Sequence, residues 1–139
     1  DSEPVENGPL KPVMTLKARV SQVRNLPKGA TVSYGRTYRA EEGITSAVIP
    51  AGYADGYPRR LSNMGKVFIN GKAYNQIGRI CMDVCMADVT GGDVRQGDEA
   101  ILFGRGGMSI EAVAQIVGTI NYELTCLVTE RANRVYVNN

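Results

Sequence analysis

The 139-residue sequence contains no histidine and no tryptophan, and it has only three cysteines. Without histidine the chain lacks the commonest general base of enzymes, and neither a Ser-His nor a Cys-His nucleophile pair can form within it. Any proton transfer by this chain therefore has to use tyrosine, lysine, cysteine or a carboxylate. A zinc site normally takes four Cys or His ligands, which the chain cannot supply, so we predict no metal site.

The sequence also has no strong charge bias and no long apolar run. Its net charge is +2, which is too small to indicate binding to nucleic acid or to a membrane surface. No apolar run approaches the roughly 20 residues that a membrane helix needs, and no signal peptide is visible. The odd, low number of cysteines favours a reducing compartment over a disulfide framework. We therefore expect a cytoplasmic protein in which Cys81, Cys85 and Cys126 are small buried side chains.

The length and composition are those of one globular domain. Hydrophobic residues make up 43% of the chain and charged residues 22%, which is ordinary for a globular protein. Residues 1–12 contain three prolines, one glycine and three acidic residues, and this composition predicts a linker or N-terminal tail. We expect the folded domain to cover residues 13–139. The first residue is Asp1 rather than a methionine, which indicates a fragment or a processed chain.

Short apolar runs and alternating patterns predict a series of β-strands. Residues 14–20 alternate between apolar and polar side chains, as in a strand with one buried face. Asn70-Gly71, at the centre of residues 65–74, is the strongest two-residue signal for a β-hairpin. Further strands are predicted at residues 31–34, 44–49, 76–80, 82–86, 98–103, 124–129 and 134–137, with turns at 25–29 and 91–93.

One helix is predicted, over about residues 109–118. Ser109 can cap its N-terminus, Glu111 lies in its first turn, and Gly118 marks its end. Apolar residues recur between them at helical spacing. Many short strands combined with one short helix favour a mainly β fold, which we predict to be a closed, mostly antiparallel β-barrel.

Two tyrosines occupy positions where a predicted strand gives way to a glycine-containing turn. Tyr34 lies between Ser33 and Gly35, and Tyr53 follows Gly52. Strand ends beside glycine are places where a rigid scaffold presents a side chain to a ligand. A tyrosine has an ordinary pKa of about 10, so acid/base work near neutral pH requires a nearby cation or hydrogen bond. A purely structural role is the alternative for both tyrosines.

Three other segments carry weaker signals. Residues 104–107 (GRGG) resemble a phosphate-binding loop but lack the Lys-Ser/Thr of a P-loop. Arg59 and Arg60 either attract an anionic substrate or lie in a solvated turn. Asp55 and Asp83 either pair as catalytic carboxylates or cap and turn the backbone after a strand.

Four motifs in order resemble the C-terminal domain of alanine racemases, which are fold-type III enzymes that use pyridoxal phosphate (PLP). They are SYGRTY at 33–38, GYADGYPRR at 52–60, GRICMD at 78–83 and TINYE at 119–123, and the resemblance runs from about residue 10 to about residue 137. It implies a subunit in which a PLP-binding (β/α)₈ barrel precedes this mostly β domain. The active site would then form across a head-to-tail homodimer. The sequence holds no such barrel and no lysine in a matching context, so we expect this chain alone to be inactive.

The resemblance implies a role for seven residues. Tyr34 matches the tyrosine that acts as acid/base on the face of the substrate opposite the PLP lysine. Met82 matches the residue whose backbone N–H helps to hold the substrate carboxylate, and Tyr122 matches the tyrosine that hydrogen-bonds the PLP phosphate. The positions that match the substrate corridor are Tyr53, Arg59, Arg79 and Ile120.

The implied activity is the interconversion of L- and D-alanine for bacterial peptidoglycan, with PLP held mainly by the barrel. The implied partners are alanine and the barrel of the other subunit, with no nucleic acid and no membrane. We expect the isolated domain to be a monomer or to associate weakly. Two alternatives stay open: a serine racemase of glycopeptide resistance, which shares all four motifs, and a non-catalytic β-barrel binding module.

Overall fold

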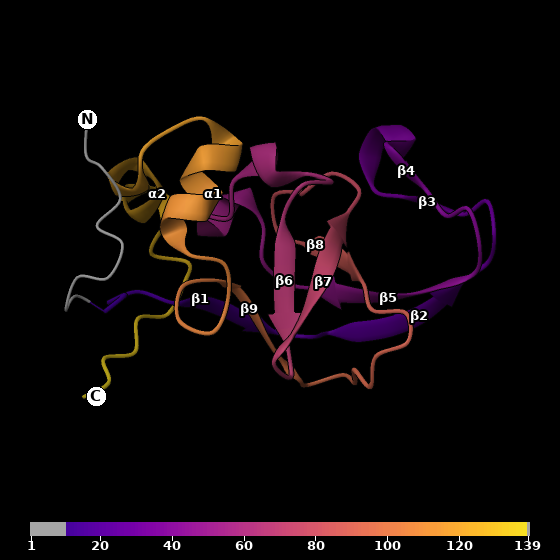
Figure 1. Cartoon of the computed structure of the whole chain (residues 1–139), viewed down its shortest axis with the longest axis horizontal. Helices are drawn as coiled ribbons and strands as arrows, with labels where there is room; N and C mark the ends of the chain where they lie inside the picture. The colour runs from indigo at the N-terminus through magenta and orange to yellow at the C-terminus, as the bar shows by residue number, and fades with distance from the viewer. Residues whose placement is uncertain (1–10, 139) are drawn as a thin grey trace.

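The computed structural model describes residues 11–138, which fold into a curled β-sheet with two helices packed at one end (Figure 1). The linker predicted at residues 1–12 falls outside the described residues except for Lys11 and Pro12. Within residues 11–138 no helix is long and apolar enough to cross a membrane.

Seven strands form one antiparallel sheet. They are β1 (Leu16–Arg19), β2 (Gln22–Leu26), β5 (Ile44–Ile49), β6 (Lys66–Ile69), β7 (Lys72–Ile77), β8 (Cys85–Asp88) and β9 (Glu99–Phe103). Their order across the sheet is β1-β9-β6-β7-β8-β5-β2. Two short strands, β3 (Thr31–Val32) and β4 (Tyr38–Arg39), pair separately. This hairpin lies at the end of the molecule away from the helices (Figure 1).

The sheet is an open half-barrel, so the predicted closed barrel is wrong. β1 and β2 are its two edges and do not pair with each other. Only Val20 and Ser21 join them, neither residue has a positive φ, and β2 follows β1 along the lower side in Figure 1. Without a reverse turn the two strands cannot form the hairpin that would close the barrel. The N–H groups of Val20 and Ser21 instead donate to Asp98 and Val48, which bind the connection to both halves of the sheet.

The core lies within the curl of the sheet and includes side chains of both helices. The alternation predicted for residues 14–20 is confirmed, because Leu16 and Val20 are buried and Ala18 is partly buried against the same core. The other strands and the helices contribute buried side chains that include Ala47, Ile49, Val67, Ile69, Cys85, Ala87, Ala100, Leu102, Val113, Val117 and Leu124. These side chains form one continuous apolar cluster, which explains how a half-barrel is stable without closing.

The predicted helix and hairpin are confirmed. Helix α1 spans Ile110–Val117, the Ser109 hydroxyl accepts a hydrogen bond from the Ala112 N–H at 3.1 Å, and Gly118 ends the helix at φ 79°. Strands β6 and β7 pair around Asn70 and Gly71. Both turn residues have positive φ (52° and 75°), as a hairpin turn of this length requires.

Several predicted strands are wrong. Residues 124–129 mostly belong to helix α2 (Asn121–Leu127), whose buried Leu124 faces the core, so a second helix accompanies the single one that we expected. Residues 134–137 form no strand. Residues 76 and 77 end β7, because Gly78 (φ 73°) bends the chain before the rest of the predicted 76–80 strand. Of the predicted strand 82–86 only the last two residues belong to β8. The start of the predicted turn at 25–29 belongs to β2.

Candidate functional site

Three loops of the predicted motifs meet in the structure: residues 33–36, 52–56 and 78–83, here called the loop cluster. The Ser33 hydroxyl donates to the backbone carbonyl of Arg79 at 2.6 Å. The N–H of Tyr53 donates to the carbonyl of Cys81 at 3.0 Å, and the N–H of Ala54 donates to the carbonyl of Met82, also at 3.0 Å. These bonds bring motifs that lie far apart in the sequence into one site.

Tyr34 begins a short 3₁₀ helix, η1 (Tyr34–Arg36), and its side chain is 74% exposed. Gly35 lies at φ 70°, and a Cβ at this position would lie 2.6 Å from Nη1 of Arg79. The glycine therefore lets the Arg79 guanidinium lie against the backbone next to Tyr34. The guanidinium thus lies beside the backbone of the residue that directly follows Tyr34.

Tyr53 begins a second 3₁₀ helix, η2 (Tyr53–Asp55), in close contact with residues 81–82. A Cβ on Gly52 would lie 2.1 Å from the carbonyl oxygen of Cys81 and 2.4 Å from that of Met82. Only glycine permits this approach, since any side chain would push the two backbones apart. Tyr53 and Met82 are 43% and 51% exposed, so both residues are accessible to a ligand.

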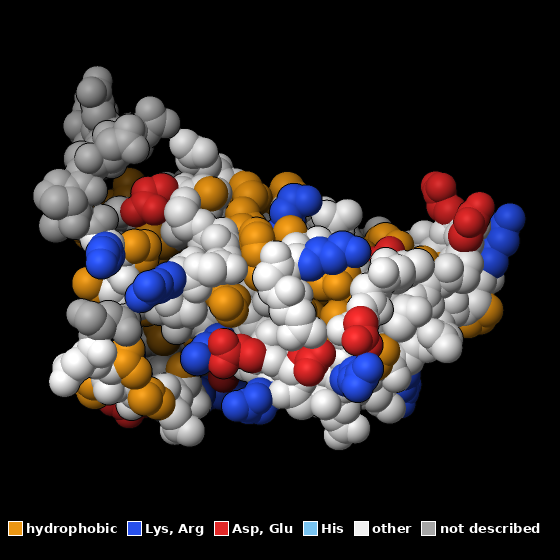
Figure 2. Space-filling view, turned by 60° about the horizontal axis from the view of Figure 1, so that its bottom comes forward, with side chains coloured by type: hydrophobic (Ala, Val, Ile, Leu, Met, Phe, Trp, Pro, Cys, Tyr) orange, Lys and Arg blue, Asp and Glu red, His pale blue; other side chains and the backbone are white. Residues whose placement is uncertain are grey.

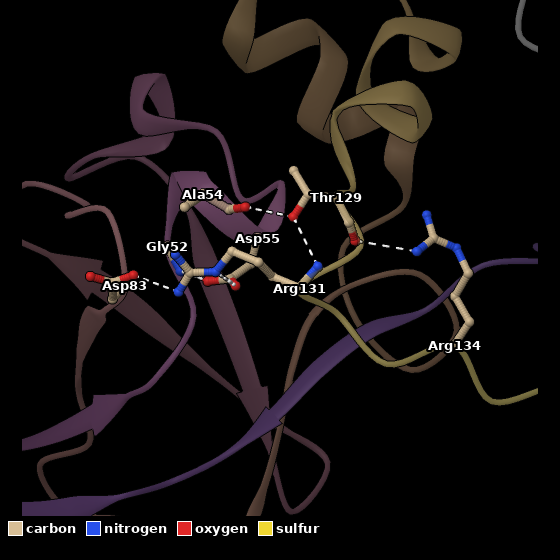
Figure 3. A network of polar contacts seen from close by, with 7 residues as sticks. All are labelled: Gly52, Ala54, Asp55, Asp83, Thr129, Arg131 and Arg134. Carbon is tan, nitrogen blue, oxygen red and sulfur yellow. Dashed lines mark hydrogen bonds and ion pairs between the residues drawn. The ribbon is translucent and has the colours of Figure 1, made fainter.

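Asp55 and Asp83 lie close together, but an arginine separates their carboxylates. Arg131 contacts Asp55 through Nε at 3.1 Å and Asp83 through Nη2 at 2.5 Å (Figure 3). Asp55 also accepts a hydrogen bond from the N–H of Gly52 at 2.9 Å. The structure thus favours a capping role for Asp55 and an ion pair with Arg131 for Asp83 over a pair of catalytic carboxylates. Sequence reasoning missed Arg131, which no motif marks.

The two arginines of the 52–60 motif differ in their environment. Both lie in the short helix η3 (Arg59–Leu61). Nη1 of Arg60 donates to the carbonyl of Val117 at 2.9 Å, at the C-terminus of α1, where unpaired carbonyls favour a cation. Arg60 is therefore a helix cap. Both arginines are exposed, but within residues 11–138 only Arg60 of the two forms a side-chain hydrogen bond, so the side chain of Arg59 is the one available to a ligand.

Tyr122 and Ile120 do not join the loop cluster. Tyr122 lies in α2 and is 66% exposed, and Ile120 caps that helix and is 59% exposed. In Figure 1, α2 lies at one end of the molecule and the β3–β4 hairpin, which encloses Tyr34, lies at the other. Tyr34, Tyr53, Arg79 and Met82 therefore form one group in the loop cluster, and Ile120 and Tyr122 form another at α2. Arg59 lies in η3, which contacts α1.

The GRGG loop is a structural turn. Its N–H groups are used within the fold: Gly104 donates to Met108 at 2.8 Å, Gly107 donates to Gly104 at 3.0 Å, and Arg105 donates to the Thr15 hydroxyl at 3.1 Å. A phosphate needs several free backbone N–H groups, so the structure does not support a phosphate-binding loop at residues 104–107.

The three cysteines occupy three different environments, so the expectation that all are buried is wrong. Cys85 is buried in the core, and burial raises the pKa of its thiol. Cys81 is half-buried, with its sulfur 3.3 Å from the Ser33 hydroxyl. Cys126 is exposed on α2 because it faces away from the core that Leu124 enters.

Charged side chains of both signs are interspersed on the face shown in Figure 2, with apolar side chains between them. No broad area of one sign stands out on that face, in line with the small net charge of +2.

Comparisons with known proteins agree on one family. The family model described as "Alanine racemase, C-terminal domain" matches residues 13–136. The alanine racemase of Clostridium perfringens is 50% identical over 138 residues, which cover 96% of this chain and 36% of that protein. That of Desulforamulus reducens is 47% identical over 139 residues, which cover 98% of this chain and 38% of that protein.

Solved structures give the same result. The alanine racemase from Streptomyces coelicolor A3(2) superposes with a TM-score of 0.88 at 44% identity, over 94% of this chain and 35% of that one. A cycloserine complex of the Clostridium difficile 630 alanine racemase gives a TM-score of 0.88 at 41% identity, over 94% of this chain and 35% of that one. The chain thus spans little more than a third of the length of the relatives that it matches.

Proposed function

The chain belongs to the alanine racemase C-terminal domain family, and we propose that it supplies Tyr34 as the acid/base of an active site that interconverts L- and D-alanine. The observation that carries this proposal is the placement of Tyr34. Its exposed ring directly precedes a tight turn at Gly35, against which the Arg79 guanidinium lies. The relatives are named alanine racemases, which favours alanine over serine as the substrate and an enzyme over a binding module.

Racemisation requires that the Cα proton leaves one face of the amino acid and returns on the other. Two bases on opposite faces achieve this most simply. Tyr34 would hold one of these protons on its phenolic oxygen.

The loop cluster also suits the carboxylate of a small amino acid. Within residues 11–138 the backbone N–H of Met82 donates to no protein group, so it is free to bind an anion. Arg59 and Arg79 add positive charge along the approach, and Tyr53 adds a hydroxyl. A backbone N–H and a guanidinium are strong partners for a carboxylate, so these groups would orient the substrate beside Tyr34.

The residues of this chain would contribute to a PLP site, but they would not form the main part of that site. The three loops of the cluster contain no lysine, so the covalent partner of the cofactor would come from another part of the assembly. Tyr122 presents its ring on the exposed side of α2 and would donate a hydrogen bond to the phosphate. When bound, PLP supplies the electron sink that stabilises a deprotonated Cα.

The separation of the two groups of site residues supports a dimer. Helix α2, which carries Tyr122, and the β3–β4 hairpin, which encloses Tyr34, lie at opposite ends of the molecule (Figure 1), so a molecule as small as alanine cannot contact both tyrosines of one chain. In a symmetric homodimer each of two equivalent sites can take Tyr34 from one subunit and Tyr122 from the other. The chain alone would then lack a complete site and be inactive.

A hybrid enzyme tests the proposal. This chain would replace the matching region of the Clostridium perfringens alanine racemase, and deuterium incorporation at Cα would be followed in D₂O from L-alanine and from D-alanine. We expect the hybrid to racemise alanine and the isolated chain with PLP to match a PLP-only control. Tyr34→Phe should slow turnover by about 10²–10⁴-fold, unequally in the two directions.

The matched control is Tyr136→Phe, which removes the hydroxyl of a tyrosine that is 91% exposed and lies outside the loop cluster. Its turnover should equal that of the unmodified hybrid. Equal turnover of Tyr34→Phe and Tyr136→Phe would show that Tyr34 is structural. A hybrid without activity on alanine would contradict the proposed activity itself.

A further inference from the structure

Arg131 connects two loops of the candidate site through their acidic side chains. Its Nε lies 3.1 Å from Oδ1 of Asp55, and its Nη2 lies 2.5 Å from Oδ1 of Asp83 (Figure 3). One guanidinium therefore holds two carboxylates that belong to segments 28 positions apart in the chain. A planar fork of donors suits this task better than the single ammonium of a lysine.

The two acids directly adjoin residues of the loop cluster. Asp55 lies two positions after Tyr53, and Asp83 directly follows Met82. The same two segments also share the backbone hydrogen bonds from Tyr53 to Cys81 and from Ala54 to Met82, both 3.0 Å long. The side-chain bridge and the backbone bonds thus fix the backbone that carries the Tyr53 ring relative to the Met82 N–H.

The carboxylates of Asp55 and Asp83 need the positive charge of Arg131 between them in order to lie this close together. The side chain of Asp55 is only 15% exposed, whereas that of Asp83 is 60% exposed. Two carboxylates this close repel each other, and water screens the less exposed one poorly. The guanidinium of Arg131 neutralises that repulsion and lets the loops stay in contact.

The segment that carries Arg131 is itself anchored to the site. The Thr129 hydroxyl donates to the carbonyl of Ala54 at 2.6 Å and accepts from the N–H of Arg131 at 3.3 Å. Arg134 donates to the Thr129 carbonyl at 3.2 Å, as Figure 3 shows. A Cβ on Gly56 would lie 2.6 Å from the Cα of Val128, so the backbones also pack closely. The backbone at Arg131 is therefore held in place independently of the contacts that its guanidinium makes.

We propose that Arg131 is a positioning residue, which holds the backbone that carries the Tyr53 ring and the backbone N–H of Met82 at a fixed separation for the substrate. Arg131 does not touch the reacting atoms in this scheme, and it acts through Asp55 and Asp83. The role of the two positioned groups toward a substrate rests on the proposed function. The restraint on the loops does not, and it is measurable without any substrate.

Amide hydrogen exchange of the full chain, followed by NMR, tests the restraint. In Arg131→Met we expect the Tyr53 and Ala54 amides to exchange at least tenfold faster, while the amides of the β6–β7 hairpin keep their protection. Arg131→Lys should give an intermediate rate, because lysine can hold one carboxylate at a time. The matched control is Arg24→Met, at an exposed position of β2, which should leave both amides within about twofold of the unmodified chain.

Unchanged exchange at Tyr53 and Ala54 in Arg131→Met would overturn the proposal. If Arg131→Met also exposes the hairpin amides, the chain is globally unfolded, and Asp83→Asn replaces it as the deciding variant. Asp83→Asn removes only the more exposed half of the bridge. It should still accelerate exchange at Ala54 several-fold, and an unchanged rate would equally overturn the proposal.

The hybrid racemase supplies the functional readout. Arg131→Met should raise KM for alanine about tenfold and change kcat less, since the bound carboxylate loses its fixed partners while Tyr34 stays in place. Faster exchange with an unchanged KM would show that the bridge is structural only and would overturn the positioning role. An inactive unmodified hybrid would instead count against the proposed function and leave the exchange result standing.

Discussion

The hydroxyl of Ser33 donates a hydrogen bond of 2.6 Å to the backbone carbonyl of Arg79. This bond ties the residue before Tyr34 to the residue whose guanidinium lies against Gly35. Ser33 itself has φ 65° and ψ −178°, a conformation that is almost confined to glycine and costs about 1–3 kcal/mol for other residues. The hydrogen bond to Arg79 is one of the contacts that stabilise this strained backbone.

Ser33→Ala should therefore destabilise the chain by about 1–3 kcal/mol, because it removes the hydrogen bond and keeps the strain. Ser33→Gly should cost less, since glycine adopts this φ without strain. Urea unfolding measures both changes. Ser21→Ala is the control: its hydroxyl also donates to a backbone carbonyl, that of Val48 at 3.1 Å, from a residue without positive φ. A Ser33→Gly variant as unstable as Ser33→Ala would contradict the role of strain.

Gln76 organises the bend that leads to Arg79. It is 1% exposed, its amide nitrogen donates to the carbonyls of Ile77 (3.0 Å) and Gly78 (2.8 Å), and its oxygen accepts from the N–H of Asn63 at 2.7 Å. Gln76→Leu keeps the volume but leaves these buried backbone groups without partners. We expect a loss of about 3 kcal/mol in the free energy of unfolding.

The control for that variant is Gln22→Leu, at an exposed strand position in β2. It should change the free energy of unfolding by no more than about 0.5 kcal/mol. A Gln76→Leu chain as stable as Gln22→Leu would mean that the 76–78 network contributes little. NMR chemical shifts of Gly78 and Arg79 would then identify whether the bend persists without the glutamine.

Local signals account for the elements that the sequence predicted well. The cap at Ser109, the stop at Gly118 and the Asn70-Gly71 turn each act within a few residues, so α1 and the β6–β7 hairpin follow from the chain alone. Helix α2 was missed because a short apolar run has no clear period, and its helical form depends on packing against α1. The open edge of the sheet was missed for a similar reason, because it depends on the path that the chain takes from β1 to β2.

The candidate site was predictable only in part, for the same reason. The motifs marked Tyr34, Tyr53 and Met82, and the structure brings their loops together. The distance of Tyr122 from these three residues depends on the whole fold, so no local sequence pattern could predict it. Arg131 was missed because its two partners lie 48 and 76 positions away in the sequence.

Tyr57 is buried with a hydroxyl that has no hydrogen-bond partner in residues 11–138. Burial and the neighbouring Cys85 raise the pKa of this tyrosine, so it stays neutral. A buried polar group without a partner costs free energy, which Phe does not incur. Tyr57→Phe should therefore leave the free energy of unfolding unchanged or raise it by about 1 kcal/mol. A loss of more than about 1 kcal/mol in urea unfolding would instead indicate an unseen hydrogen bond to water.

Asp98 gives the fold a pH dependence in acid. Its carboxylate accepts hydrogen bonds from the N–H of Arg95 and from the side chain of Asn70, both 2.9 Å long. The Arg95 backbone hydrogen bond, followed by that of Asn70, holds the pKa of Asp98 below its usual value of 3.8. Because the folded state lowers this pKa, the stabilisation is present above pH 3.8 and is lost as the pH falls through the folded-state value.

Asp98→Asn should therefore be less stable than the unmodified chain at pH 7, and the difference should shrink as the pH falls below 3.8. Thermal unfolding across that range measures the difference. Asp93→Asn is the control in the same turn, since its ion pair with Arg95 is largely exposed and such pairs contribute little. A difference between Asp98→Asn and the unmodified chain that stays constant with pH would contradict the linkage. So would an NMR titration that places the pKa of Asp98 at or above 3.8.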